Sequence, residues 1–174
     1  MAKKISPLER AVNSLNVDDI YICGSSAELL NEFEPRYEAQ WGEVEHAHMH
    51  LVSKSQIIQL ENPEAQYDSK LRIFIEFGAK GARSVDEEEA IDLFEIRACF
   101  VAEYWITNKD LLEDEEAISE FAFKNCSFQV WPYWREFAAA TSTRMNIQKI
   151  VMPVMMRPSN ESDNPASTEK GQKP

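Results

Sequence analysis

Glycine, cysteine and long apolar runs are scarce in this chain of 174 residues. It has five glycines, and it contains neither a phosphate-binding GxGxxG or GxxxxGK[ST] motif nor a GxSxG nucleophile elbow. No apolar run approaches the ~20 residues of a membrane span, and no apolar signal core follows the basic start Met1–Ile5. We therefore expect a cytoplasmic protein without membrane insertion, and these motifs give no support to an enzyme.

The three cysteines, Cys23, Cys99 and Cys126, are widely spaced and form no CxxC pair. Their odd number argues against a disulfide framework, so we interpret them as small buried side chains in a reducing compartment. Basic residues are also few. The chain has 18 Lys and Arg residues and 30 Asp and Glu residues, which gives a net charge of −12. That charge disfavours generic nucleic-acid binding, and it suits solubility or docking to a basic protein partner.

A capped helix and a series of strands are predicted in the first two thirds of the chain. Ser6-Pro7-Leu8-Glu9 is a capping box that starts a helix ending near Asn16. Strands are expected at 17–23, before a bulge or turn at 24–26, and at 44–60, 70–80 and 91–106. The segment 31–43 has the composition of a loop, and its aromatic residues either hold it on the core or line a hydrophobic groove. The charged segment 81–89 is interpreted as a second, solvated loop.

The strand 91–106 is apolar on one face and only half polar on the other. This pattern suggests that the domain's own helix covers one face and that something else, such as a second subunit, covers the other. A long helix is predicted from about Asp114 to Met145, with a kink or break near 128–131 caused by Pro132. That helix is apolar on more than one side, which indicates burial between two layers.

The predicted fold class is α+β: a four-stranded antiparallel sheet packed on a long C-terminal helix, with an extra short N-terminal helix. Residues 1–156 form a single domain in this prediction, and 147–156 are its last ordered piece. Residues 157–174 hold prolines and polar side chains without an aromatic, and they are expected to be a disordered tail.

All three histidines, His46, His48 and His50, alternate along one predicted strand. They share a face, so neighbouring imidazoles could bind zinc, although three in a row reach one ion poorly. A polar, solvent-facing side of the strand, opposite Ala47, Met49 and Leu51, is the simpler interpretation. We predict no metal site here.

Tryptophan and methionine are plentiful near the C-terminus and in the aromatic loop. Methionine is adaptable and suits promiscuous apolar surfaces. The surplus indicates either plain core and subunit interface, or a site for unfolded or extended polypeptide.

The segment from Phe128 to Arg144 resembles the core motif of the SecB family of protein-export chaperones. That motif has an apolar pair, then Pro-Tyr, then Arg-Glu after one residue, as in Pro132-Tyr133 and Arg135-Glu136 here. Gln40-Trp41 and Glu43-Val44 look like the family's loop tryptophan and the start of its second strand, and 92–101 looks like its fourth strand. The stretch 145–150 lacks the family's Gly and Pro, and the polar tail replaces a second helix. The chain thus looks most like divergent SecB-like proteins, some of which serve toxin–antitoxin systems.

The resemblance implies a homotetramer, a dimer of dimers with long helices between sheets. It implies an ATP-independent holdase that binds unfolded preproteins or an antitoxin-type client in hydrophobic grooves, without a cofactor. It also implies possible docking to the export motor SecA.

Two sets of residues are the candidates for these roles. The client-binding set is Tyr37, Trp41, Met152, Met155 and Met156. The set for helix packing or oligomer contact is Phe121, Phe128, Trp131 and Trp134. Two rival functions stay open: a dedicated binding partner of one protein, such as an antitoxin, and, less favoured, a metal-dependent enzyme that uses the His46/His48/His50 row.

Overall fold

The computed structural model describes residues 5–37, 41–61, 66–86, 89–152 and 155. Its helices and strands are α1 (Pro7–Ser14), β1 (Leu15–Leu29), β2 (Glu45–Gln59), β3 (Ser69–Asp86), β4 (Glu89–Ile106), α2 (Glu115–Phe121) and α3 (Ser127–Arg144). The short 3-10 turns are η1 (Pro35–Tyr37), η2 (Trp41–Glu43) and η3 (Lys109–Glu113), and the π-helical turn η4 (Ala122–Cys126) joins α2 to α3. The predicted tail 157–174 lies outside the described residues.

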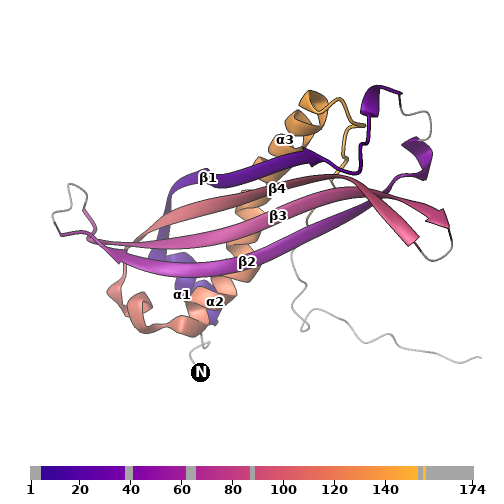
Figure 1. Cartoon of the computed structure of the whole chain (residues 1–174). Helices are drawn as coiled ribbons and strands as arrows, with labels where there is room; N and C mark the ends of the chain where they lie inside the picture. The colour runs from indigo at the N-terminus through magenta and orange to yellow at the C-terminus, as the bar shows by residue number, and fades with distance from the viewer. Residues whose placement is uncertain (1–4, 38–40, 62–65, 87–88, 153–154, 156–174) are drawn as a thin grey trace, which may run out of the picture.

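The strands form one antiparallel sheet in the order β1-β4-β3-β2, with the helices on one of its faces (Figure 1). The predicted fold class is therefore confirmed. Leu71, Ile73, Ile75 and Phe77 of β3 are completely buried on the helix-bearing face. The alternate residues of β4 from Phe94 to Ile106 face the same way, because they are the cross-strand partners of these β3 residues or of their neighbours.

The helix α1 begins as the capping box requires. The Ser6 hydroxyl accepts a hydrogen bond from the Glu9 backbone N–H at 3.2 Å, and the Glu9 carboxylate accepts one from the Ser6 N–H at 2.9 Å. Arg10 then joins α1 to the start of α2 through an ion pair with Asp114 at 2.7 Å. The helix ends at Ser14, two residues before the predicted end, because β1 starts at once with Leu15.

The predicted loop at 81–89 is wrong over most of its length. β3 continues to Asp86 and β4 begins at Glu89, with Ala82 opposite Asp92 and Arg83 opposite Ile91. Cross-strand pairing therefore overrides the local charge of this segment. The bulge or turn expected at 24–26 lies one residue earlier, as a register shift between Ile22 and Gly24, and residues 24–26 pair regularly with β4 while β1 runs on to Leu29.

The predicted long helix is interrupted, but not at the predicted place. The irregular turn is Ala122–Cys126, whereas Pro132 lies inside α3. Ser127 explains the position, because its backbone N–H and its hydroxyl both donate to the Ala122 carbonyl, the hydroxyl at 3.2 Å. A bond from residue i to i−5 is the bond of a π-helical turn.

No helix among the described residues is long and apolar enough to cross a membrane.

Candidate functional site

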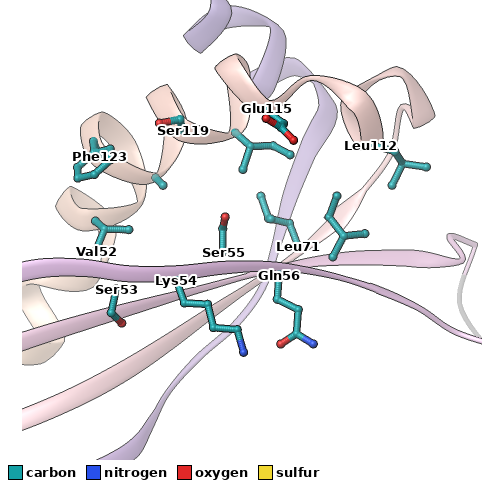
Figure 2. A pocket seen from close by; sticks show the side chains of 13 residues that line it. Val52, Ser53, Lys54, Ser55, Gln56, Leu71, Leu112, Glu115, Ser119 and Phe123 are labelled. Carbon is teal, nitrogen blue, oxygen red and sulfur yellow. The ribbon is translucent and has the colours of Figure 1, made fainter.

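A cleft of about 540 Å³ lies between the edge strand β2 and the helices α2 and η4 (Figure 2). Val52, Ser55 and Leu71 point into it from the sheet, and Phe123 points toward it from the helical side. The side chains of Ser53, Lys54 and Gln56 point to the opposite side of the sheet in Figure 2, so these residues contribute mainly backbone.

The cleft exists because α2 and η4 stand over an edge strand instead of a central one. β2 pairs with β3 alone in the described sheet, so its other backbone edge is free of a strand partner. The lining is divided about evenly between apolar and polar groups, and Phe123 at the rim is 58% exposed. A partly apolar trough beside a free strand edge can accept an extended peptide.

Polar groups make up about half of the cleft lining. The side chains of Ser55, Ser119 and Glu115 are among them, and all three residues are exposed. Within the described ranges no three His, Cys, Asp or Glu residues gather closely enough to hold a metal ion. The cleft thus offers apolar area together with polar groups.

The histidine row lies on the helix-bearing face of the edge strand, and its three side chains are exposed there, as the interpretation of a solvent-facing side expected. His50 is paired with Phe77 and stacks on its ring at 5.0 Å, and His46 lies 6.0 Å from the Phe94 ring. Burial lowers the pKa of both imidazoles, and the neighbouring His48 lowers that of His46 further.

His50 also ties β2 to the helical layer. Its Nε2 is 2.9 Å from the Ser127 hydroxyl, which itself donates to the Ala122 carbonyl. Since that hydroxyl hydrogen is already used, Nε2 carries the proton and donates. Within the row, His50 therefore has a structural role, since it connects β2 to the helical layer next to the cleft.

The aromatic loop lies at the end of the sheet away from α1 and α2 (Figure 1). Tyr37 is 79% exposed there. Trp41 is half-buried, packs on the core and contacts Phe33 edge-on with ring centroids 5.5 Å apart. Of the two predicted client-binding aromatics, only Tyr37 presents most of its side chain to solvent.

The methionines of the client-binding prediction differ in position. Met152 is 5% exposed and belongs to the core, together with Ile147 and Ile150. This burial conflicts with a surface role for Met152. Met155 is half-buried, and Met156 lies outside the described residues.

The four residues predicted for packing form two groups. Phe121 and Trp134 are buried, the first against Tyr104 at 5.0 Å and the second stacked on Phe77 at 5.6 Å. Trp131 is half-buried beside Phe77, and Phe128 is 39% exposed.

Part of the outer face of the sheet, opposite the helices, is covered by its own side chains. Val101 lies on that face and is completely buried, although no helix stands over it. Lys70 pairs with Asp18 at 2.6 Å and with Glu103 at 3.1 Å, and it lies 4.3 Å from the Trp105 ring. Leu51 on the same face is 49% exposed, so the face is not covered throughout.

The cleft was missed by sequence reasoning because its residues come from separate strands and helices. Phe123 offered one signal, since it is a large apolar side chain between the polar residues at 119–120 and 124–125. Phe123 faces β2 across the cleft because the helical region is interrupted at Ala122–Cys126. The sequence had predicted that interruption near 128–131.

No family model matches this chain, and no curated protein matches it. Among solved structures, the SecB-like chaperone Rv1957 of Mycobacterium tuberculosis, in complex with a ChAD peptide from the antitoxin HigA1, matches with a TM-score of 0.64. The identity is 15%, and the match covers 88% of this chain and 99% of that chain. A protein of unknown function from Streptococcus agalactiae matches with a TM-score of 0.33 and 9% identity, over 80% of this chain and 98% of that one. The first likeness and the sheet topology show that this chain has the SecB-like fold, as the sequence resemblance predicted.

Proposed function

We propose that this protein is an ATP-independent holdase that binds extended polypeptide in the cleft between β2 and α2. The observation that carries the proposal is a cleft of about 540 Å³ with a mixed polar and apolar lining, beside a strand edge that has no strand partner among the described residues. The protein binds and releases its client without a cofactor and without catalysis.

The client binds as an added strand along β2. Its backbone pairs with the free edge of β2, which gives affinity without a sequence requirement. Side chains of an extended segment alternate in direction, so every second one points to the helical side and enters the cleft, where Val52, Leu71 and Phe123 supply apolar area. Phe123 covers such a side chain from the rim.

A dedicated client is favoured over a general one by a specific observation. The SecB-like chaperone that shares this fold was solved with a peptide of an antitoxin. We propose a client of the same kind, a segment of one partner protein that stays extended until it is bound. The general alternative is the holding of unfolded preproteins with docking to SecA, for which the net charge of −12 suits a basic surface on the motor.

The aromatic loop is proposed as a second client contact. Tyr37 supplies exposed aromatic area. Trp41 and Met155, which belong to the same predicted client-binding set, are half-buried and add smaller apolar areas. Met156 stays in the proposal as part of the same set, and Met152 leaves it because of its burial. The protein works in the cytoplasm as a homotetramer in this proposal.

The decisive experiment compares two apolar-to-polar variants from the two sides of β2. Phe123→Ser removes the 58% exposed ring at the cleft, and Leu51→Ser removes a 49% exposed side chain on the outer face. Because burial of one aromatic contributes roughly 1.5–3 kcal/mol, Phe123→Ser should weaken client affinity at least about tenfold. Leu51→Ser should leave it unchanged.

The readout is suppression of aggregation for a panel of reduced, denatured proteins, with affinities measured by calorimetry. Suppression of most panel members indicates a general holdase, and suppression of few indicates a dedicated one. If wild-type protein suppresses none of them and binds no extended apolar peptide, the proposed function is wrong. Equal losses in both variants would instead reject the cleft as the site.

A further inference from the structure

A bulge in β1 brings two cysteines onto one face of the sheet. Ile22 is opposite Phe100 and Gly24 is opposite Cys99, so Cys23 is the extra residue between them. Alternation puts Cys23 on the outer face with Tyr21, and Cys99 shares that face with Val101.

The two residues lie beside each other. The Cys23 thiol donates to the carbonyl oxygen of Cys99 at 3.4 Å, and the Cys23 side chain is one cause of the raised pKa of the Cys99 thiol. A bulge sets two residues of one strand across from one residue of its partner, here Cys23 and Gly24 across from Cys99, and disulfides span Cα separations of about 4.4–6.8 Å. Both cysteines are free in the structure, Cys23 exposed and Cys99 half-buried.

We propose that Cys23 and Cys99 form a reversible disulfide that fastens the edge strand β1 to the central strand β4. This inference is independent of the proposed client binding, because neither residue lines the cleft beside β2. Cys126 takes no part, since it is completely buried next to Tyr104 on the helix-bearing side.

The reaction needs a small disulfide as oxidant, such as oxidised glutathione. The exposed Cys23 thiolate attacks one sulfur of glutathione disulfide, and one reduced glutathione leaves. Cys99 then loses its proton and attacks the Cys23 sulfur, which releases the second glutathione. In total two protein thiols are oxidised, one glutathione disulfide is reduced to two thiols, and the protein loses two hydrogen atoms.

The different environments of the two thiols explain the order of these steps. The pKa of Cys99 is raised to about 12, mainly by burial and secondly by the neighbouring Cys23. Cys99 is therefore a weak attacking group until a mixed disulfide sits beside it, whereas Cys23 is the exposed one. A thiol that is not stabilised as thiolate also makes a disulfide that resists reduction.

The bond acts on the second half of β1. Gly24–Leu29 pairs only with β4, and its outer side is an edge of the sheet. This half of the strand leads into the aromatic loop through Leu30. Oxidation thus restrains the edge strand and the start of that loop.

The test treats the full chain with oxidised glutathione and measures intact mass and peptide maps without reduction. We expect a protein lighter by two hydrogens, a Cys23–Cys99 linked peptide, and a single free thiol after denaturation. The midpoint of thermal unfolding should rise by roughly 5–15 °C, because a long loop is closed in the unfolded chain. A reducing dithiol should reverse all three changes.

Two variants and one control complete the design. Cys23→Ser and Cys99→Ser should each abolish the linked peptide and the thermal shift, and Cys126→Ala should retain the linked peptide. A stable glutathione adduct on Cys23 without the second step would overturn the proposal. So would a link to Cys126, a bond between two copies of the chain, or an unreacted protein.

Discussion

At the scale of single residues, His50 shows how one side chain connects two layers. Its ring stacks on Phe77 of β3, and its Nε2–H donates to Ser127 at the start of α3. The Phe77 ring also stacks on Trp134 of α3, with 5.6 Å between centroids. Stacked rings therefore connect His50 on the edge strand to the core.

Titration of His50 should make stability depend on pH. Burial holds the pKa of folded His50 below the ordinary histidine value of about 6.5, so between the two values the unfolded chain binds more protons than the folded one. The free energy of unfolding should therefore rise with pH up to about 7 and fall as the pH is lowered toward 5. Urea titrations across this range measure the slope.

The variant His50→Gln keeps a hydrogen-bond donor for Ser127 and removes the titration. It should reduce the slope of the pH profile and leave the part that His46 contributes, while His48→Gln on the same strand controls for the loss of an imidazole. An identical slope in wild type and His50→Gln would show that other groups cause the dependence.

Sequence alternation predicted that the three histidines share a solvent-facing side, and they are exposed, but it did not show that this side is the one that bears the helices. The register shift between Val52 and Lys54 reverses the alternation within β2. Residues before and after it therefore cannot be combined into one pattern. The apolar Met49 and Leu51 belong to the outer face of an edge strand, where burial is incomplete on both sides.

At the scale of elements, β3 and β4 run beyond the places where local composition predicts their ends. The glycine and the acids at 81–89 favour a loop, yet the two strands pair almost to the turn between them. Gly81 is opposite Phe94, whose completely buried ring occupies the space where a side chain at 81 would lie. The glycine is thus a packing requirement of the sheet and not a strand breaker.

Substitution of Gly81 should test this interpretation. A Cβ at this position overlaps the Phe94 ring, so Gly81→Ala should destabilise the protein by about 1–3 kcal/mol through overpacking. At Gly24 a Cβ meets nothing within 4 Å, so Gly24→Ala should cost little. Chemical denaturation of both variants gives the comparison, and equal midpoints would contradict the role of Gly81.

The helical part shows the same division between local and non-local information. The acids at 115–116, the cap at Asp114 and the basic Arg144 predicted where the helical region starts and ends. The interior break was assigned to Pro132, the strongest local breaker. It lies instead where Ser127 bonds to Ala122 and meets His50, a contact from a strand 77 residues earlier in the chain.

At the scale of the whole molecule, exposed apolar side chains are spread over the helical layer, the strands and the aromatic loop. Phe123 and Tyr133 are 58% and 48% exposed on the helical layer, and Val17 is 60% exposed on β1. The sequence predicted such a surplus, but through tryptophans and methionines, of which Trp134 and Met152 are buried. Which members of an apolar surplus reach the surface depends on packing that composition does not encode.

The proposed tetramer predicts a mass about fourfold that of the 20.0 kDa chain in multi-angle light scattering. Tyr133→Glu places a charge on the helical layer and should give a smaller species, because burial of an unpaired charge opposes association. Leu51→Glu places the same charge on the outer face of the sheet and should leave the mass unchanged. A wild-type mass of one chain would contradict the tetramer.

The ion pairs above Val101 also limit how copies of this protein can stack. Two outer faces brought together would strip water from Lys70, Asp18 and Glu103 without offering new partners, because these groups already bind one another. Sheet-on-sheet growth from that side is therefore unfavourable. Aggregates that form at high concentration should grow from the helical layer or the strand edges, and a fibre with dry contacts between outer faces should not occur.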